Sequence, residues 1–383
     1  MVDLYRRGIS ESIFGFIAGD AEVGLNQRPP TEVNPAPSRV ILIPRALLVV
    51  ADYNTISLLV IGRRDAMKTC RIDKSLRYLS LLLIIIVAAL CGCSALQRTQ
   101  MPPRLKTVPA GYELVGVPFY PQTDYQCGPA TLAMALTYHG LSITPEELQS
   151  QIYTPSLKGS LQMDMVGATR RHGKIAYEIT SPDAIFPEIA AGHPVIVLQN
   201  LGFTWRPVWH YAVVIGYNFT DKSVILRSGV TQRKVMSYYT FEKSWAHSNY
   251  WGLLVLEPTQ IPVAAEETKY LTAVLGLEKS RQFQAAVSGY QTALTRWPGS
   301  LPALMGLGNS YYALENLPEA ESAFREATER YPLAAAAYNN LAQVLLEQGR
   351  KREALAAAHK AVSLGGPLVS VSKKTLQEIQ STH

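Results

Sequence analysis

Residues 118–140 read PFYPQTDYQCGPATLAMALTYHG, in which Cys127 opens a helix-forming run. The Gly-Pro pair after the cysteine suits a tight turn into the first helical turn. A second segment, WHYAVVIGYN at residues 209–218, has the character of a β-strand and carries His210, 83 residues after the cysteine. A thiol at a helix N-terminus faces the positive end of the helix dipole and ionises more easily. We therefore predict that Cys127 is a nucleophile and that His210 is its base.

The other three cysteines, Cys70, Cys91 and Cys93, lie in or beside a segment with the composition of an export signal. Residues 67–92 combine a basic head, an apolar core and small residues before Cys93, which is typical of a signal peptide. Its end, LCGC, resembles a bacterial lipobox, in which the cysteine is lipidated and becomes the mature N-terminus. The alternative is a transmembrane anchor, although the apolar run is shorter than the roughly 20 residues that a spanning helix needs.

Lipidation of Cys93 would leave Cys127 as the sole free thiol of the mature chain, outside the cytoplasmic membrane. A thiol without a disulfide partner in an oxidising compartment favours a catalytic role. Ser94, rather than an acidic residue, favours sorting to the outer membrane, facing the periplasm. We predict that residues 1–66 are a mis-assigned extension before the true start at Met67; the alternative is a mostly disordered cytoplasmic arm.

Removing residues 1–92 leaves 25 basic and 22 acidic residues, a net charge of +3. This balance does not indicate a nucleic-acid-binding surface. The 291 residues from Cys93 onward suffice for two domains. After a linker at 93–107, we predict a first domain at 108–258. A joint at Thr259–Glu267, rich in Pro and Ala, is expected to let this first domain fold alone.

The second domain shows an internal period of 34 residues, with copies that begin at Glu267, Leu301 and Ala335. This pattern over residues 267–366 resembles the tetratricopeptide repeat, three copies long. Such solenoids bind other proteins along a concave face; the alternative is an appendage that serves stability alone. Residues 367–383 predict a helix that caps the open end. Small residues repeat at positions 20 and 27, where two helices approach closely: Ala286, Ala320, Ala354, Ala293, Ala327 and Ala361.

Within the first domain, the sequence TPEE at 144–147 predicts a capped second helix that runs to about Tyr153. Residues 161–172 predict a third helix. Helices followed by an antiparallel sheet indicate an α+β fold. Five β-rich runs separated by turn residues follow, at 175–180, 194–199, 210–217, 223–227 and 252–256.

Three features together resemble one enzyme family: Gln122 five positions before Cys127, the CGPA start of the helix, and the HYAVVIGY strand. They are similar to the papain-like cysteine peptidases that cut bacteriocin leaders after a double glycine, and to their stand-alone relatives. The resemblance covers residues 108–258 and implies a papain-like α+β fold, a protein or peptide substrate and no cofactor. It implies that Cys127 is the nucleophile and His210 the general base. The Gln122 amide and the Cys127 backbone N–H would hold the oxyanion.

One position departs from the family. These peptidases carry Asp or Asn near the end of the strand after the histidine, usually before a proline, to orient the imidazole. Here the strand reads SVILRSGV, with Ser228 and Gly229 at those positions. We predict that Ser228 orients the ring, with Asp221 or Asn200 as alternatives. The loss of a charged partner affects the expected rate more than the existence of the chemistry.

Several residues are assigned structural roles. Trp205 and Trp209 flank the approach to His210 and are predicted to be core residues, although they could line a cleft. No nucleotide-binding motif is present, and the membrane and ATPase domains of the family's exporter-fused members are absent from the sequence. No metal site is predicted, because five further histidines lack metal-ligand spacing with cysteines or acids: His139, His172, His193, His247 and His359.

The sequence thus favours a lipid-anchored cysteine peptidase of the bacterial cell envelope. It would cut a protein substrate, and its repeats would recruit that substrate or a protein partner. One alternative is a related thiol amidase or acyltransferase that acts on peptidoglycan or another amide. The other is a catalytically inactive binding module, which the missing acid motivates.

Overall fold

The computed structural model describes residues 47–52, 55–60, 101–103, 108–122 and 126–382. The predicted signal peptide at 67–92 and the predicted lipidation residue Cys93 lie outside the described residues. Within residues 1–66, strands β1 (Leu47–Asp52) and β2 (Thr55–Val60) pair antiparallel. These two strands belong to a unit separate from the one that contains the domains described below. None of the helices in the described part of the chain has the length and apolar character needed to cross a membrane.

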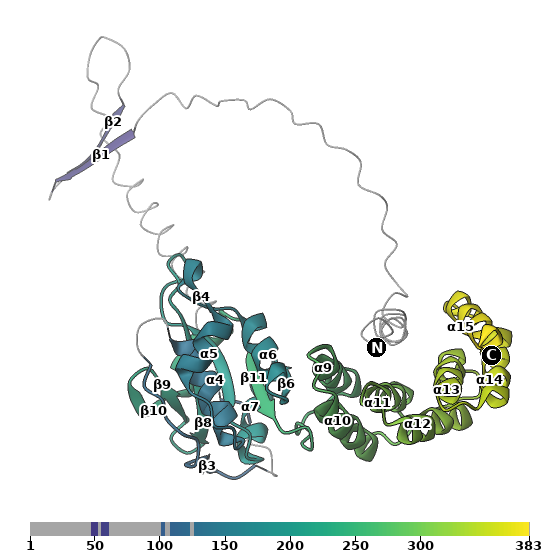
Figure 1. The fold of residues 1–383 in the computed structure, drawn as a ribbon. Coiled ribbons are helices and arrows are strands. Elements are labelled where there is room, and N and C mark those ends of the chain that lie inside the picture. Colours follow the sequence, from purple (N-terminus) through teal and green to yellow (C-terminus); the bar gives the residue numbers. More distant parts are fainter. Residues whose placement is uncertain (1–46, 53–54, 61–100, 104–107, 123–125, 383) are drawn as a thin grey trace. The chain divides into compact units, whose positions relative to one another are not determined.

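One antiparallel sheet forms the framework of the first domain (Figure 1). Its strands follow the order β10-β9-β8-β7-β11-β6, and β3 pairs with β8 outside this path. The five β-rich runs of the sequence correspond to β6, β7, β8, β9 and β11, whereas β10 is a largely exposed strand without an apolar pattern. The strand bounds are β3 (Gly111–Glu113), β6 (Ile175–Ile179), β7 (Val195–Asn200), β8 (Trp209–Asn218), β9 (Ser223–Ser228), β10 (Thr231–Ser237) and β11 (Gly252–Leu256).

Helices precede and interrupt this sheet, and the predicted α+β fold is confirmed. The predicted capping box is present, because Thr144 N–H donates to Glu147 Oε2 at 2.8 Å and Glu147 N–H donates to Thr144 Oγ1 at 3.3 Å. A short ribbon of β4 (Tyr153–Thr154) and β5 (Gly159–Ser160) links α5 to α6. The helix bounds are α4 (Cys127–Tyr138), α5 (Pro145–Ile152), α6 (Gln162–Arg171), α7 (Pro182–Ala190) and α8 (Tyr238–Ala246). The sequence did not predict α7 and α8.

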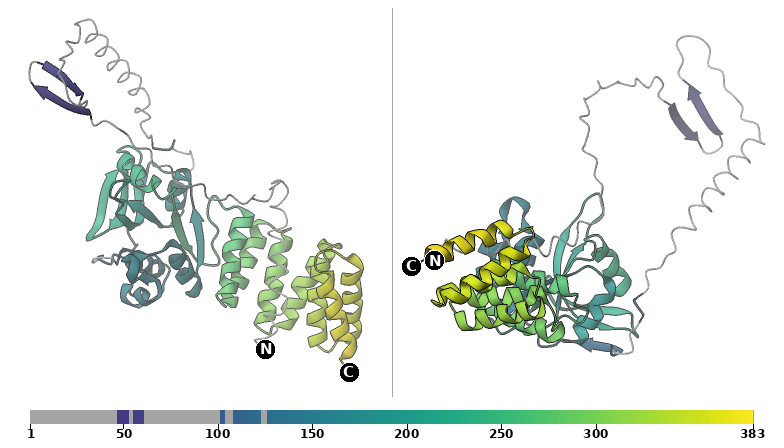
Figure 2. Two further views of the ribbon diagram at one scale, coloured as in Figure 1. Left: turned by 90° about the horizontal axis from the view of Figure 1, so that it is seen from above. Right: turned by 90° about the vertical axis from the view of Figure 1, so that its right-hand side faces the viewer.

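Helices α9 to α15 follow as three antiparallel pairs and a final helix, which stack in sequence order (Figure 2). The pairs begin at Glu267, Leu301 and Ala335, the three predicted first positions. Gly308 faces the ring of Phe324, and a Cβ at this glycine would lie 2.5 Å from that ring. The last helix buries Ile379 and closes the end of the stack, as predicted. The bounds are α9 (Glu267–Lys279), α10 (Phe283–Arg296), α11 (Leu301–Ala313), α12 (Leu317–Arg330), α13 (Ala335–Glu347), α14 (Lys351–Leu364) and α15 (Val369–Ser381).

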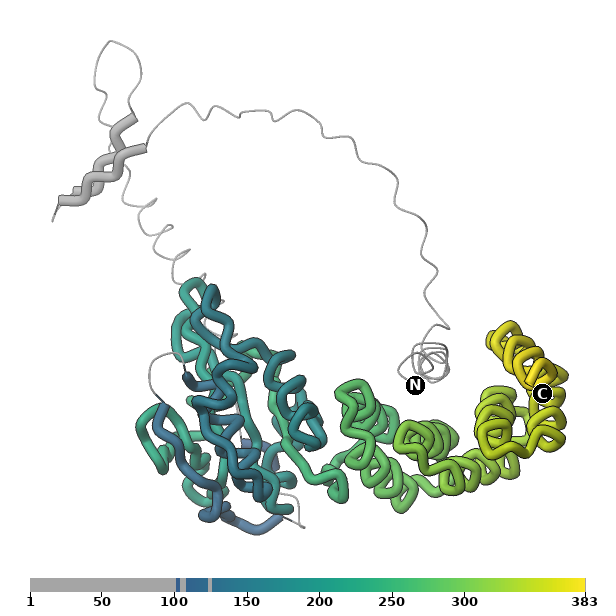
Figure 3. The backbone as a smooth tube through the Cα atoms, viewed as in Figure 1, coloured from purple at the N-terminus to yellow at the C-terminus, as the bar shows by residue number. Residues whose placement is uncertain are grey.

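The first helix pair shares a hydrophobic core with the sheet. The chain passes from β11 through a short connection into α9 (Figure 3), and α9 packs against β6. One cluster of buried side chains includes Ile175 and Tyr177 of β6 together with Val274 and Leu277 of α9. The expectation that the joint lets the first domain fold alone stays a prediction, and this shared core argues against it. The sequence showed the composition of the joint but not which element the apolar face of α9 covers.

Candidate active site

The predicted nucleophile, Cys127, is the first residue of α4 and is partly buried. The next nine residues, to Leu136, are all buried, so this helix occupies the interior of the domain. The cysteine sulfur accepts hydrogen bonds from the backbone N–H groups of Gly128 and Tyr211. Because Tyr211 follows His210 on β8, these contacts hold the thiol beside the strand that carries the predicted base.

Gly128 makes room for the β4–β5 ribbon beside the nucleophile. A Cβ at this position would lie 2.4 Å from Ser160 Oγ, closer than real Cβ atoms approach. The Tyr211 hydroxyl donates to the Ser160 carbonyl at 3.1 Å and so fixes the ribbon. The Ser160 hydroxyl is buried and has no hydrogen-bond partner among the described residues. The glycine is therefore a steric requirement as well as a turn residue, and no sequence signal pointed to Ser160.

The predicted base, His210, contacts the predicted orienting residue. His210 Nε2 lies 3.0 Å from the hydroxyl of Ser228, which stands at the end of the adjacent antiparallel strand β9. Ser228 is only 5% exposed, so this contact is largely shielded from water. The predicted proximity of Ser228 and the imidazole is thus present.

The two alternative partners of the imidazole make other contacts. Asn200 Oδ1 accepts hydrogen bonds from the backbone N–H groups of Gly202 and Val208, both at 2.9 Å. Asp221 lies in the turn after β8, at the opposite end of that strand from His210, and accepts a hydrogen bond from the Asn218 amide at 2.8 Å. Both side chains stabilise turns.

Gln122 is clamped by the backbone of Gly229. Its N–H donates to the Gly229 carbonyl at 3.1 Å, and its side-chain Oε1 accepts from the Gly229 N–H at 3.0 Å. This second bond defines the amide orientation, because a backbone N–H requires an acceptor. The Nε2 group is consequently left buried without a partner in the described part of the chain. Gly229 has a φ of 60°, a left-handed conformation that favours glycine.

Gln122, Cys127, His210 and Gly229 line one cleft of about 930 Å³. Ser228 does not line it and lies behind the imidazole. The remaining wall comes from the β4–β5 ribbon at 157–162, the start of β8 with the residues before it, and the segment after α8. These further lining residues are 157–162, Leu198, 207–209, Tyr211 and 247–249. Residues from five separate parts of the sequence therefore converge around one thiol.

Burial controls the protonation of the pair. It raises the pKa of the Cys127 thiol above the ordinary value, and the hydrogen bonds from backbone N–H groups offset this shift only in part. Burial also lowers the pKa of His210 to about 4, and the nearby charge of Lys234 contributes. At neutral pH the resting pair is therefore a thiol and a neutral imidazole. The expectation of an easily ionised thiol is wrong for this resting state, because desolvation outweighs the hydrogen bonds from backbone N–H groups.

The two tryptophans predicted as core residues are exposed. Trp205 is 79% exposed, and Trp209 is 49% exposed and lines the cleft. They lie on a hairpin that extends beyond the sheet between β7 and β8, a boundary that the sequence pattern did not reveal. Among the other histidines, His247 lines the cleft, whereas His193 Nδ1 lies 2.7 Å from Glu188 Oε2. No group of three or more potential metal ligands comes together in the described residues.

Comparison with known proteins assigns both parts of the chain. Residues 114–252 match the model of the Peptidase_C39 like family. Residues 271–327 and 305–367 match the tetratricopeptide repeat model. The chain thus has a C39-like peptidase domain followed by tetratricopeptide repeats. The comparison with curated proteins gave no match.

Solved structures similar to this chain include proteins of both kinds. A protein from Bacillus anthracis assigned as a C39-like peptidase is 19% identical, with 39% of this chain and 98% of that chain covered and a TM-score of 0.33. The peptidase domain of ComA, a bifunctional ABC transporter of Streptococcus, is 21% identical, with coverage of 37% and 98% and a TM-score of 0.31. The secretion chaperone SycD of Yersinia enterocolitica is 18% identical, with coverage of 30% and 91% and a TM-score of 0.29.

Proposed function

We propose that this chain is a cysteine peptidase, with Cys127 as nucleophile, His210 as general base and Gln122 as oxyanion donor. The main support is the Gln122 amide, whose carbonyl is clamped by Gly229 while its NH₂ group, in the cleft, has no hydrogen-bond partner among the residues that the structure describes. A buried donor without a partner costs on the order of 1–3 kcal/mol. Its presence in the same cleft as a thiol and an imidazole favours a ligand oxygen that forms during a reaction.

The proposed reaction uses the two ring nitrogens of His210 differently. In the tautomer that this reaction requires, Nε2–H donates to Ser228 Oγ, and Nδ1 accepts the thiol proton as the Cys127 sulfur bonds to the substrate carbonyl carbon. The Gln122 NH₂ and the Cys127 backbone N–H at the N-terminus of α4 stabilise the oxyanion. The C–N bond then breaks, and the imidazolium protonates the leaving amine. Water, deprotonated by the same imidazole, hydrolyses the thioester.

The missing carboxylate favours a second candidate, an inactive peptidase-like binding module. A third candidate is hydrolysis or acyl transfer by the same thiol at another amide bond, such as one in peptidoglycan. A chain that begins at Ser94 separates these candidates, because Cys127 is then its sole cysteine. A peptide-based thiol-reactive probe should label it, Cys127→Ala should abolish labelling, and Gln122→Ala should slow peptide hydrolysis. Absence of labelling in folded protein favours the inactive module, and cleavage of muropeptides without cleavage of peptides favours the amidase.

We further propose that lipidation at Cys93 anchors the protein in the cell envelope, facing the periplasm from the outer membrane. The support is the signal-like composition of residues 67–92. Mass spectrometry of the membrane fraction should then find an acylated N-terminal Cys93. A mature chain that keeps Met1 or Met67 would contradict the anchor, and fractionation tests the choice of membrane.

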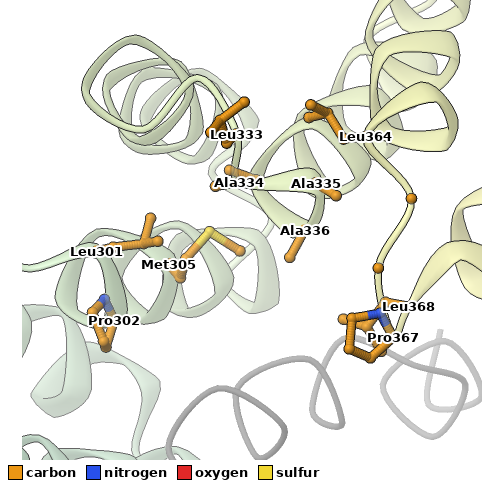
Figure 4. Close-up of a pocket in the computed structure, with 13 residues that line it drawn as sticks. Leu301, Pro302, Met305, Leu333, Ala334, Ala335, Ala336, Leu364, Pro367 and Leu368 are labelled. Carbon is orange, nitrogen blue, oxygen red and sulfur yellow. The ribbon is translucent and has the colours of Figure 1, made fainter. Parts of the chain in front are cut away.

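Tetratricopeptide repeats support protein–protein interaction, and we propose that they recruit a substrate or a partner here. An apolar pocket of about 270 Å³ between the second and third repeats offers one place for an apolar side chain (Figure 4). Its wall includes Met305, Leu364 and Leu333, of which Leu333 is 82% exposed. Crosslinking in cells to a partner, with Leu333→Ser as the weakened variant, tests this role.

A further inference from the structure

The hairpin between β7 and β8 carries an unusual group of exposed apolar side chains. We define this apolar hairpin as residues 201–209, LGFTWRPVW. Phe203 is 68% exposed and Trp205 is 79% exposed, and their rings stack with centroids 5.8 Å apart. Three further large apolar residues of the same hairpin are exposed: Leu201, Val208 and Trp209. Apolar residues gathered in this way mark an interaction surface, whereas single exposed ones do not.

The apolar hairpin is well ordered by its own hydrogen bonds. Phe203 and Arg206 exchange two backbone hydrogen bonds at 3.0 and 3.1 Å, and Leu201 N–H donates to the Val208 carbonyl at 2.8 Å. A Cβ at Gly202 would lie 2.5 Å from the Arg206 carbonyl oxygen, so the tight crossing needs glycine. The backbone therefore holds the rings out in solvent rather than letting them fold back onto the domain.

The position and charge of the apolar hairpin indicate what it meets. Phe203 and Trp205 do not line the cleft, so the tip is a protrusion rather than the wall of a peptide groove. Residues 201–220 contain no acidic side chain, and Arg206 at the tip is exposed. Tryptophan and phenylalanine beside a cation suit the interface of a bilayer with anionic headgroups.

We infer that the apolar hairpin inserts into the surface of an anionic lipid bilayer. Pro207, Val208 and Trp209 belong to the same hairpin and line the cleft. Insertion of the tip therefore brings the mouth of the cleft to the level of the lipid headgroups. This surface would act in addition to a lipid anchor, and it does not depend on the proposed peptidase activity.

The test uses the chain from Ser94, which retains both hydrophobic clusters of residues 101–382 and lacks the predicted lipidation site. Its cosedimentation is measured with vesicles of phosphatidylethanolamine and phosphatidylglycerol at 3:1. The double variant F203S/W205S should bind at least tenfold more weakly. Val115→Ser removes another highly exposed apolar side chain, which lines neither of the two pockets described above, and should bind like the unmodified chain. Circular dichroism confirms that all three proteins are folded.

A spectroscopic readout identifies the residue that contacts lipid. Trp205 is the most exposed of the five tryptophans, because Trp209 is 49% exposed, Trp297 is half-buried, and Trp245 and Trp251 are buried. Vesicles should shift the tryptophan emission to the blue, and Trp205→Phe should remove most of the shift. No binding by the unmodified chain, or equal binding by F203S/W205S, would overturn the inference. The inference would also be overturned if F203S/W205S still bound vesicles but no longer turned over a protein substrate. That result would mean that the apolar hairpin binds the substrate.

Discussion

Replacing Ser228 by aspartate should restore a charged partner to the imidazole and lower the pKa of the nucleophile. Ser228 Oγ lies 3.0 Å from His210 Nε2 in a site that is 5% exposed. Two opposite unit charges about 4 Å apart interact by about 4 kcal/mol at an effective dielectric constant of about 20. Since one pKa unit corresponds to about 1.4 kcal/mol, this is a shift of about three units upward for the imidazole.

The sign of each shift follows from the charges. Burial holds the pKa of His210 at about 4, so the imidazole of the natural chain is neutral at pH 6 to 7. A carboxylate at position 228 stabilises the imidazolium and raises this pKa towards neutrality, although the cost of burying the carboxylate reduces the gain. An imidazolium in the same cleft as Cys127 in turn favours the thiolate. The thiol and the imidazole then titrate as a coupled pair.

The measurement is the rate of iodoacetamide alkylation of Cys127 as a function of pH, in the chain that begins at Ser94. The unmodified protein should show a midpoint above the ordinary value of about 8.5, and Ser228→Asp should lower it by at least about one unit. Ser228→Asn is the matched control, because it has the size of aspartate without the charge. Equal midpoints for the Asp and Asn variants, both folded, would refute the assignment of Ser228 as the neighbour that controls the imidazole.

Three other changes test the site and the core. Gln122→Ala should lower kcat by about 10²- to 10³-fold in protein that circular dichroism shows to be folded, and an unchanged kcat would exclude the oxyanion role. Gly128→Ala should impair both activity and thermal stability, because its Cβ would collide with Ser160 Oγ; a melting temperature and activity equal to those of the unmodified chain would contradict this. Burial raises the pKa of Glu278 to about 7, so its contribution to stability is fully present below pH 4.5 and is lost as pH rises through 7. Glu278→Gln should remove that loss in thermal melts from pH 5 to 8, whereas parallel melting curves would show that this carboxyl does not titrate there.

The sequence was most informative where one local rule determines an element. The 34-residue period predicted the first residue of each repeat, and the TPEE pattern predicted the capping box of α5. The strands with apolar patterns were also found. The structure added α7, which contains Pro187 inside the helix, and β10, whose side chains are mostly exposed. A proline inside a helix and a strand without alternating apolar residues both depart from the sequence patterns that predict such elements.

The sequence predicted the residues that carry the proposed chemistry, but it did not predict the groups that hold those side chains in position. Two sequence segments and the strand after them contain the predicted site residues at distinctive positions: Gln122, Cys127, His210 and Ser228. The clamp on Gln122 comes from the backbone of Gly229, which no side-chain pattern records. The pKa of the thiol was predicted in the wrong direction, because the helix dipole can be read from sequence whereas desolvation depends on tertiary packing.

The shared core changes the expected relation between the two domains. In a simple solenoid each repeat contacts its neighbours, and a terminal repeat could be removed without loss elsewhere. Here α9 is the first helix of the repeats and also covers β6. The guanidinium of Arg170, on α6, lies against Gly276 of α9, and a Cβ at Gly276 would be 2.3 Å from it. Removing the repeats at Pro258 would expose Tyr177 and Ile175, which are now 3% and 0% exposed. The peptidase domain and the first repeat should therefore unfold together, whereas the later repeats add stability only through their neighbours.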